Sequence, residues 1–329
     1  MLVTRLTKLL GIEIPVVQGG MQWVGYPKLV AAVSNAGGLG VLTALSQANP
    51  EALRTAIRET KKLTSKPFGV NITILPSITP PPYEVYARVA VEEGIRIFET
   101  AGNNPGPLIK YFKENGCKVI HKCTTIRHAK SAQKLGVDVL SIDGFECAGH
   151  PGEEDIGGMI LLARAAQELK IPFIASGGIA DGRGLAAALA LGADGVNMGT
   201  RFVCTEESSV HQNIKEAIVK ATEQDTTHIF RTLGNTSRVF KNKIAKEVVA
   251  IERRPGGAKF EDIRELVSGA RGKLVYETGD VDAGVWTAGL TLGLIKDIPT
   301  CEVLLKNMVK EAEQVITGVG NLVQAQAKL

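Results

Sequence analysis

The sequence predicts an α/β protein, a (β/α)8 or TIM barrel with an accessory C-terminal helical region. Short apolar runs alternate strictly with amphipathic segments between residues 14 and 200. Such alternation requires parallel strands joined by right-handed crossovers, and eight units is the number that closes a barrel. The alternative is an open doubly wound sheet, which would carry a G-x-G-x-x-G turn after its first strand, and that spacing is absent.

The last two apolar runs supply the third observation, because each breaks at a glycine turn. These turns are Ser176-Gly177-Gly178 and Gly199-Thr200. Glycine allows a ligand to approach the backbone closely and allows the positive φ values that turn successive N–H groups toward an anion. In a (β/α)8 barrel, the phosphate site lies on the loops after strands seven and eight. We therefore expect a phosphate cradle here.

The barrel elements are predicted from periodicity and from glycine and proline punctuation. The predicted strands are residues 14–18, 39–44, 68–73, 95–100, 118–123, 137–143, 173–175 and 195–198. The predicted helices between them are residues 27–36, 50–63, 83–93, 107–115, 126–135, 158–169 and 184–191. In the segment 50–63, Leu53, Ile57 and Leu63 fall on one helical face.

A proline-rich stretch, residues 75–82, follows the third strand. Its prolines exclude both a helix and a central strand. We interpret it as a lid over the strand ends, with a rigid connector as the alternative.

The rhythm of strands and helices stops after the eighth strand. Helical periodicity continues at residues 210–222, 241–252, 260–268 and 298–326, with Gly/Pro punctuation between them. We expect residues 1–222 to form the barrel and residues 223–302 to form an accessory helical region at the strand-end face. The last helix, residues 303–329, is a candidate to return to the barrel wall.

Composition excludes several classes of protein. No apolar run approaches the length of a membrane span and the first residues lack a secretory pattern, so a cytoplasmic location is expected. The net charge of +4 is carried by scattered lysines and arginines, which argues against nucleic-acid binding. The five cysteines have no C-x-x-C spacing, which argues against a disulfide framework and a zinc site.

Catalytic groups in a barrel of this type lie at the carboxyl ends of the strands. The residues there include backbone donors, an amide, hydroxyls, one cation and one histidine, but no cluster with metal-ligand spacing. This set predicts an organic cofactor with a phosphate tail and no metal. The candidates are Gly20, Met21, Gln22, Asn71, Thr73, Lys122, His150, Ser176, Gly177, Gly178, Gly199 and Thr200.

Six motifs from this rim resemble those of the nitronate monooxygenase family, also called 2-nitropropane dioxygenases. They are Q-G-G-M-Q (18–22), F-G-V-N-I-T (68–73), H-K-C-T (121–124), D-G-F-E-C-A-G-H-P-G (143–152), A-S-G-G-I-A-D-G-R-G (175–184) and N-M-G-T-R-F (197–202). The resemblance implies a (β/α)8 barrel with non-covalent FMN. The motifs H-K-C-T (121–124) and G-F-E-C-A-G-H-P-G-E (144–153) further resemble a branch of NAD(P)H:quinone reductases.

The resemblance also implies roles for the rim residues. It places Gly20, Met21 and Gln22 along the flavin, and Ala148 near its ring. Asn71 and Thr73 would lie at the polar edge of the ring. The phosphate would be held by Ser176, Gly177, Gly178, Gly199 and Thr200.

Lys122 and His150 are the candidate catalytic residues. A cation at Lys122 would stabilise the negative charge that develops on a flavin during reduction, whereas the alternative is a surface lysine. His150 would donate to a substrate oxygen or take a proton, and its alternative is loop hydrogen bonding. Cys147 is interpreted as a packing residue, and His121 as structural. His128, His211 and His228 are expected on helical surfaces.

An acidic run in the same loop allows three interpretations. It consists of Glu146, Glu153, Glu154 and Asp155. These side chains could be solvated, could repel anionic partners, or could pair with an arginine.

Three activities compete. The favoured one is an FMN-dependent NAD(P)H:quinone reductase, since a proline lid and an open rim suit a dinucleotide. The second is a nitronate monooxygenase that oxidises alkyl nitronates with O2. The third is a cofactor-free barrel enzyme for a phosphorylated substrate, in which Lys122 would form a Schiff base. The expected partners are therefore a quinone or alkyl nitronate, NAD(P)H and O2, and a homodimer stays open.

Overall fold

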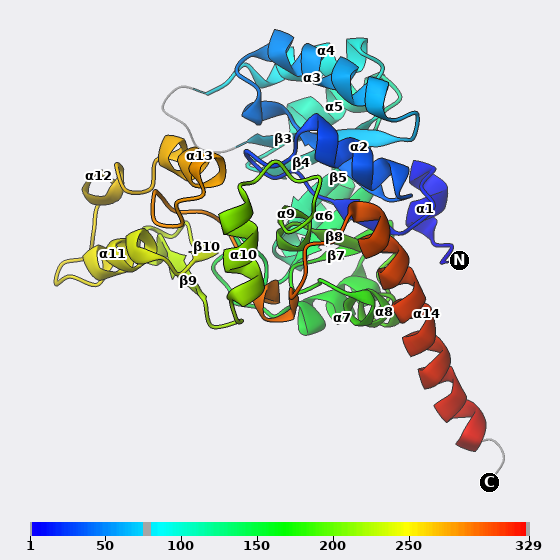
Figure 1. Cartoon of the computed structure of the whole chain (residues 1–329). Coiled ribbons are helices and arrows are strands. Elements are labelled where there is room, and N and C mark those ends of the chain that lie inside the picture. Colours follow the sequence, from blue (N-terminus) through cyan, green and yellow to red (C-terminus); the bar gives the residue numbers. More distant parts are fainter. Residues whose placement is uncertain (1, 75–79, 327–329) are drawn as a thin grey trace.

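The computed structural model describes residues 2–74 and 80–326. Its centre is a closed barrel of eight parallel strands, in which each strand pairs with its neighbour in sequence and β8 pairs with β1 (Figure 1). The strands are β1 Val16–Gln18, β2 Leu39–Thr43, β3 Phe68–Ile74, β4 Ile97–Gly102, β5 Lys118–Cys123, β6 Val139–Asp143, β7 Phe173–Ser176 and β8 Val196–Met198. This architecture confirms the predicted (β/α)8 barrel.

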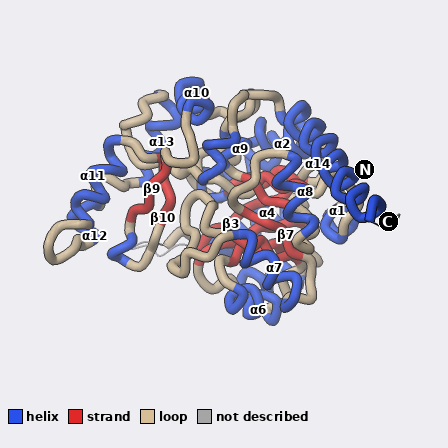
Figure 2. Tube along the Cα trace, turned by 90° about the horizontal axis from the view of Figure 1, so that it is seen from below, coloured by secondary structure: helices blue, strands red, loops and turns tan. Residues whose placement is uncertain are grey.

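Seven helices alternate with the strands and cover the outside of the barrel (Figure 2). They are α2 Pro27–Asn35, α3 Pro50–Leu63, α4 Tyr83–Glu92, α5 Gly106–Glu114, α6 Ile126–Lys134, α7 Gly158–Glu168 and α8 Gly182–Ala190. Short polar side chains start several of them: Asn49, Thr125 and Asp181 each accept a hydrogen bond from the first helical turn. The boundaries move slightly, since β4 and β6 each begin two residues later than predicted.

One helix escaped prediction and closes the barrel at the amino ends of its strands. This is α1 Arg5–Leu10, which begins with a capping box between Thr4 and Thr7. Leu6 and Leu10 are buried in a cluster with apolar side chains of the strands. Arg5 forms a 2.7 Å ion pair with Asp194, just before β8. The short helix therefore blocks one end of the barrel and leaves the other for chemistry.

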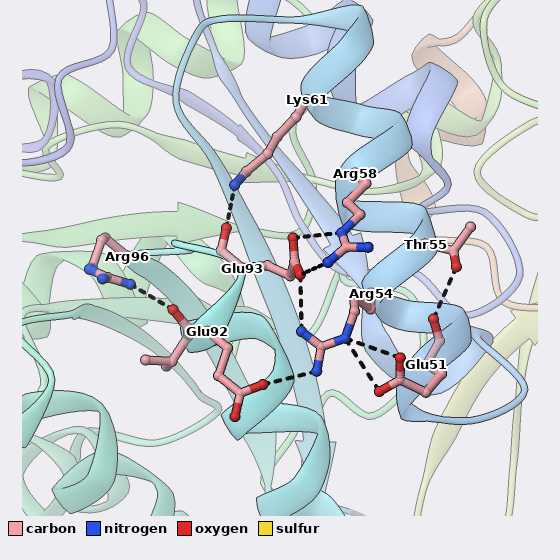
Figure 3. A network of polar contacts seen from close by, with 9 residues as sticks. Glu51, Arg54, Thr55, Arg58, Lys61, Glu92, Glu93 and Arg96 are labelled. Carbon is pink, nitrogen blue, oxygen red and sulfur yellow. Dashed lines mark hydrogen bonds and ion pairs between the residues drawn. The ribbon is translucent and has the colours of Figure 1, made fainter.

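Neighbouring helices of the barrel wall are also joined by charge. Arg54 of α3 contacts Glu51, Glu92 and Glu93, and Arg58 contacts Glu93 as well (Figure 3). Solvent screens ion pairs near a protein surface, so each contributes little to stability. The network links α3 to α4.

The last helix, α14 Cys301–Gln326, packs against α8 and α2. Its buried side chains are Cys301, Leu304, Leu305, Met308 and Ala312. Farther along, Ile316, Val319, Leu322 and Val323 are exposed, and the helix projects away from the body (Figure 1). Only the first half of α14 therefore belongs to the barrel wall.

The segment between β8 and α14 contains a strand hairpin as well as helices. Its elements are α9 Thr200–Val203, α10 Gln212–Lys220, β9 Thr226–Ile229, β10 Ser237–Phe240, α11 Lys243–Glu252, α12 Phe260–Ile263 and α13 Gly269–Thr278, with 3-10 turns at Arg231–Leu233 and Leu290–Leu294. Ile229, Val239, Ala245, Val248 and Ile263 form a separate small core. None of the helices in the described part of the chain is both long and apolar enough to cross a membrane.

The accessory region contains helices, as predicted, but some of its elements differ from the predicted ones. The antiparallel pair β9–β10 was not expected, because its strands are short and lack an alternating apolar pattern. The predicted helix 260–268 stops at Ile263, and α13 begins at Gly269, which looked like a break.

The proposed proline lid, residues 75–82, falls mostly outside the described residues.

Candidate active site at the carboxyl ends of the strands

A buried carboxylate joins four segments at the mouth of the barrel. Glu99 on β4 has no exposed surface. Its Oε1 accepts hydrogen bonds from the Gly20 N–H and Asn71 Nδ2, both at 2.9 Å, and its Oε2 accepts from Asn197 Nδ2 at 3.1 Å. Three donors compensate the burial of this charge. Glu99 was not among the residues predicted from the sequence, although a charged residue inside an apolar strand is a usable signal.

The Asn71 side chain also contacts Thr73 and the loop after β1. Thr73 donates its hydroxyl to Asn71 Oδ1 at 3.0 Å, so both ends of the Asn71 amide are engaged within the protein. A side chain at Gly20 would overlap Asn71. The predicted ring-edge residues, Asn71 and Thr73, therefore lie beside the loop after β1 and fix its path.

That loop is fastened to β2 as well. The Met21 N–H donates to the Thr43 hydroxyl and that hydroxyl donates to the Met21 carbonyl, both at 3.0 Å. Met21 is half-buried, and Gln22 is exposed beside it. Of the three predicted loop residues, Gly20 and Met21 are held rigidly and Gln22 has a free side chain among the described contacts.

Lys122 lies at the end of β5 with two acids close by. Its Nζ is 3.6 Å from Asp143 Oδ1, and 24% of its side-chain surface is exposed. Burial alone would lower the pKa of Lys122, but the negative charges of Asp143 and Glu99 outweigh burial and raise that pKa. The ammonium group therefore stays protonated, which suits an electrostatic role and disfavours a Schiff-base nucleophile.

The glycine turns after β7 and β8 offer unpaired backbone donors. Gly177 and Gly178 have φ values of +87° and +77°, which favour glycine. Within residues 2–74 and 80–326, no hydrogen bond uses the N–H groups of Gly177, Gly178, Gly199 or Thr200. A phosphate would satisfy such donors. Ser176 is buried beside them, and the Thr200 hydroxyl accepts a hydrogen bond from the Gly289 N–H at 3.0 Å.

A second reason also requires glycine at position 177, and the sequence did not indicate it. A Cβ atom on Gly177 would lie 2.8 Å from the backbone nitrogen of Cys147. The glycine therefore makes room for the loop after β6. Burial, followed by the charge of Asp143, raises the pKa of the Cys147 thiol, so this cysteine packs against the turn and is a poor nucleophile.

The loop after β6 carries Ala148 and His150 and is bound to the accessory hairpin. Gly149 and Arg238 exchange two backbone hydrogen bonds, at 3.0 and 2.6 Å. The Arg238 guanidinium lies 4.6 Å from the centre of the Phe145 ring and donates to the Phe145 carbonyl. His150 is exposed and its Nδ1 is 3.0 Å from the Thr236 carbonyl oxygen. Ala148 is half-buried beside it.

Two further histidines, His121 and His228, have distinct environments. His121 is buried and contacts the Thr100 hydroxyl at 2.8 Å, and burial lowers its pKa to about 4. His228 lies on strand β9 and not on a helical surface, so that expectation was wrong. Its ring packs edge-on against Phe145, and burial together with the Arg238 charge lowers its pKa to about 4.

Three of the four acidic residues in the loop have partners. Glu146 accepts from the Gly158 N–H at 2.9 Å, at the start of α7. Glu153 binds Thr236, and Asp155 forms a 2.9 Å ion pair with Arg231. Glu154 is exposed and makes no such contact with any described residue. Within the same described ranges, no group of three His, Cys, Asp or Glu side chains could hold a metal ion.

Comparison with known proteins gives consistent matches along nearly the whole chain. The family model described as nitronate monooxygenase matches residues 3–311. The chain is 35% identical to a protein of Rhodococcus jostii named (3aS,4S,5R,7aS)-5-hydroxy-7a-methyl-1-oxo-octahydro-1H-indene-4-carboxyl-CoA dehydrogenase, over 97% of this chain and 98% of that protein. It is 29% identical to the nitronate monooxygenase of Paraburkholderia phytofirmans, over 94% of this chain and 95% of that one.

A solved structure also resembles this chain over nearly its whole length. FabK from Thermotoga maritima superimposes with a TM-score of 0.90 and 37% sequence identity, and the match covers 98% of this chain and 100% of that one.

Proposed function

Because the chain belongs to the nitronate monooxygenase family, an oxidoreductase family, we propose that it is an FMN-dependent enzyme that transfers a hydride from NAD(P)H to an organic acceptor. The acceptor that its motifs favour is a quinone. The observation that carries the proposal is the set of unpaired N–H groups at Gly177, Gly178, Gly199 and Thr200, together with a protonated lysine, Lys122, at the same end of the barrel.

The residues of the rim fit an FMN group. The two glycine turns and Ser176 would hold its phosphate. Gly20, Met21, Gln22 and Ala148 would lie along the ring, with Asn71 and Thr73 at its polar edge. When bound, FMN accepts a hydride from one substrate and passes it to another.

The chain would contribute charge, order and a proton. Lys122 supplies a positive charge that Asp143, at 3.6 Å, keeps in place. Glu99 fixes the Gly20 loop and Asn71 through its three hydrogen bonds. Reduction of a quinone to a hydroquinone needs one hydride and one proton, and His150 is the exposed group that would exchange that proton.

A second substrate class is favoured by one specific observation. The 35% identical relative from Rhodococcus jostii is named as the dehydrogenase of a CoA thioester. Hydride exchange with a CoA thioester is therefore the second candidate, and oxidation of an alkyl nitronate is the third. The cofactor-free alternative is disfavoured, because the raised pKa of Lys122 opposes Schiff-base formation.

The acceptor can be identified with the reduced holoenzyme. Enzyme reduced without oxygen by one equivalent of NAD(P)H is mixed with a quinone, an α,β-unsaturated acyl-CoA, or buffer, and flavin absorbance is followed. We expect rapid reoxidation by the quinone. Reoxidation by the acyl-CoA alone would replace the quinone with the thioester. No reoxidation by either would reject both acceptors.

A further inference from the structure

Thr236 immediately precedes β10, and all its polar atoms contact the loop that carries His150. Only 1% of its surface is exposed. Its carbonyl oxygen is 3.0 Å from His150 Nδ1. Its N–H and hydroxyl donate to the two carboxylate oxygens of Glu153, at 2.7 and 2.5 Å. A buried threonine of the accessory hairpin thus connects Glu153 with His150.

The contact with the carbonyl determines which nitrogen of His150 carries the proton. A carbonyl oxygen can only accept a hydrogen bond, so Nδ1 must be the donor. In the neutral ring, Nε2 is then the nitrogen with the lone pair. Thr236 therefore selects the Nδ1–H tautomer and leaves Nε2 available to exchange a proton.

Glu153 fixes the carbonyl that makes this selection. Its carboxylate accepts from both donors of one residue, and hydrogen bonds to a charged acceptor are the stronger kind. The neighbouring backbone bridge between Gly149 and Arg238 holds the other side of the loop. The carboxylate thereby limits how far Thr236 can move from His150.

We infer that Glu153 is a positioning residue, which acts through Thr236 to keep His150 in the Nδ1–H tautomer for proton exchange at Nε2. The inference rests on the proposed function of His150. Glu153 is 83 residues from Thr236 in the chain and makes no hydrogen bond or ion pair with the His150 imidazole among the described residues. Its effect on His150 is therefore indirect.

The tautomer can be observed directly in the full-length protein. The chain is labelled with 15N-histidine, and two-bond nitrogen–proton spectra are recorded near pH 8.5, above the ordinary histidine pKa of about 6.5. The signal of His150 is assigned by its loss in His150→Gln. We expect the Nδ1–H pattern in the wild type and a shift toward Nε2–H in Glu153→Ala, with kcat for acceptor reduction lowered ~10-fold or more.

Three further variants sharpen the test. Glu154→Ala removes the same charge from the next residue and should leave the tautomer unchanged. Glu153→Gln can still accept from the Thr236 N–H through its amide oxygen and should keep the Nδ1–H pattern. Thr236→Val removes the hydroxyl contact alone and should shift the pattern partly, and it serves as the test if Glu153→Ala does not fold.

Two results would overturn the inference: the wild-type tautomer in Glu153→Ala, or, if that variant does not fold, the wild-type tautomer in Thr236→Val. Failure of the proposed function looks different. If His150→Gln reduces the acceptor at the wild-type rate, His150 is not the proton donor, yet the spectra still decide whether Glu153 sets its tautomer.

Discussion

At the scale of single residues, the proposed function assigns to the charge of Lys122 the main effect on the chemistry of a bound flavin. Replacement by methionine should leave FMN bound and make its midpoint potential more negative, because the reduced, anionic flavin loses a nearby cation. Loss of a charge interaction of about 2 kcal/mol corresponds to a shift on the order of 50 mV for a two-electron couple. The measurement is a spectroscopic redox titration of the purified variant.

Lys118 provides the matched control, since it lies at the opposite end of β5 and contacts Asp138 at 3.6 Å. Lys118→Met should leave the midpoint potential unchanged. Equal midpoint potentials for the wild type and Lys122→Met would contradict this role and would leave Lys122 as an ordinary surface lysine.

His121 makes a prediction about pH. Burial lowers its pKa to about 4, below the ordinary value of about 6.5, so between these values the unfolded chain binds a proton here and the folded chain does not. The contribution of His121 to the free energy of unfolding is therefore fully present above pH 6.5. It decreases as the pH falls toward 4, by up to about 3 kcal/mol.

Urea unfolding at pH 7 and at pH 4.5 measures the effect. His121→Asn should reduce the loss of unfolding free energy between the two pH values, although His228 contributes a loss of the same sign. An identical pH dependence for wild type and variant would show that His121 is not buried as a neutral ring.

At the scale of elements, substitutions in the two glycine turns should have different effects on FMN binding and on stability. A Cβ on Gly199 would meet only the flexible Met21 side chain, at 3.4 Å, and its φ of −116° suits other residues. Gly199→Val should therefore fold normally but bind FMN at least ~10-fold more weakly, because the side chain enters the predicted phosphate site. FMN content per chain and Tm provide the readouts.

Gly177→Ala should behave differently. Its Cβ would clash with the Cys147 backbone and its φ is left-handed, so we expect a loss of about 2 kcal/mol in stability, with any loss of FMN following from it. Stoichiometric FMN in Gly199→Val would contradict the cradle assignment.

The contact between α8 and α14 depends on Gly182, the first residue of α8. A Cβ at Gly182 would clash with the Met308 carbonyl and with Glu311. Gly182→Ala should cost ~1–3 kcal/mol of unfolding free energy, as overpacking does. Gly320, in the projecting half of α14, has no neighbour within 4 Å, and Gly320→Ala should be neutral or slightly stabilising. Equal effects of both substitutions would contradict this difference in packing.

The success of sequence reasoning varied between elements for physical reasons. The barrel helices were predictable because each carries an apolar face, and some also have a clear cap, such as Asn49 before α3. Helix α1 was missed because it is only 6 residues long, and β9–β10 was missed because its stability comes from contacts with α11 and from Arg238. The residue pattern within a short segment does not indicate contacts with residues that are distant in the chain.

At the scale of the whole molecule, the accessory region completes the rim of the barrel. Besides the Gly149–Arg238 bridge, Leu290 donates to the Glu146 carbonyl at 3.0 Å and Gly289 donates to the Thr200 hydroxyl. The sequence could place Lys122, His150 and the glycine turns at strand ends from the barrel alone. It could not find Thr236 or Arg238 as partners of the β6 loop, because their proximity arises only when the two regions pack together.

The central claim is that this rim binds FMN and accepts electrons from a reduced nicotinamide. The most direct measurement is anaerobic stopped-flow mixing of the oxidised holoenzyme with NADH, NADPH or propyl nitronate, with flavin absorbance as the signal. We predict rapid bleaching by NADH or NADPH. Bleaching by the nitronate alone would contradict the claim and would make the protein a nitronate monooxygenase, and protein that takes up no FMN would contradict the assignment of the site itself.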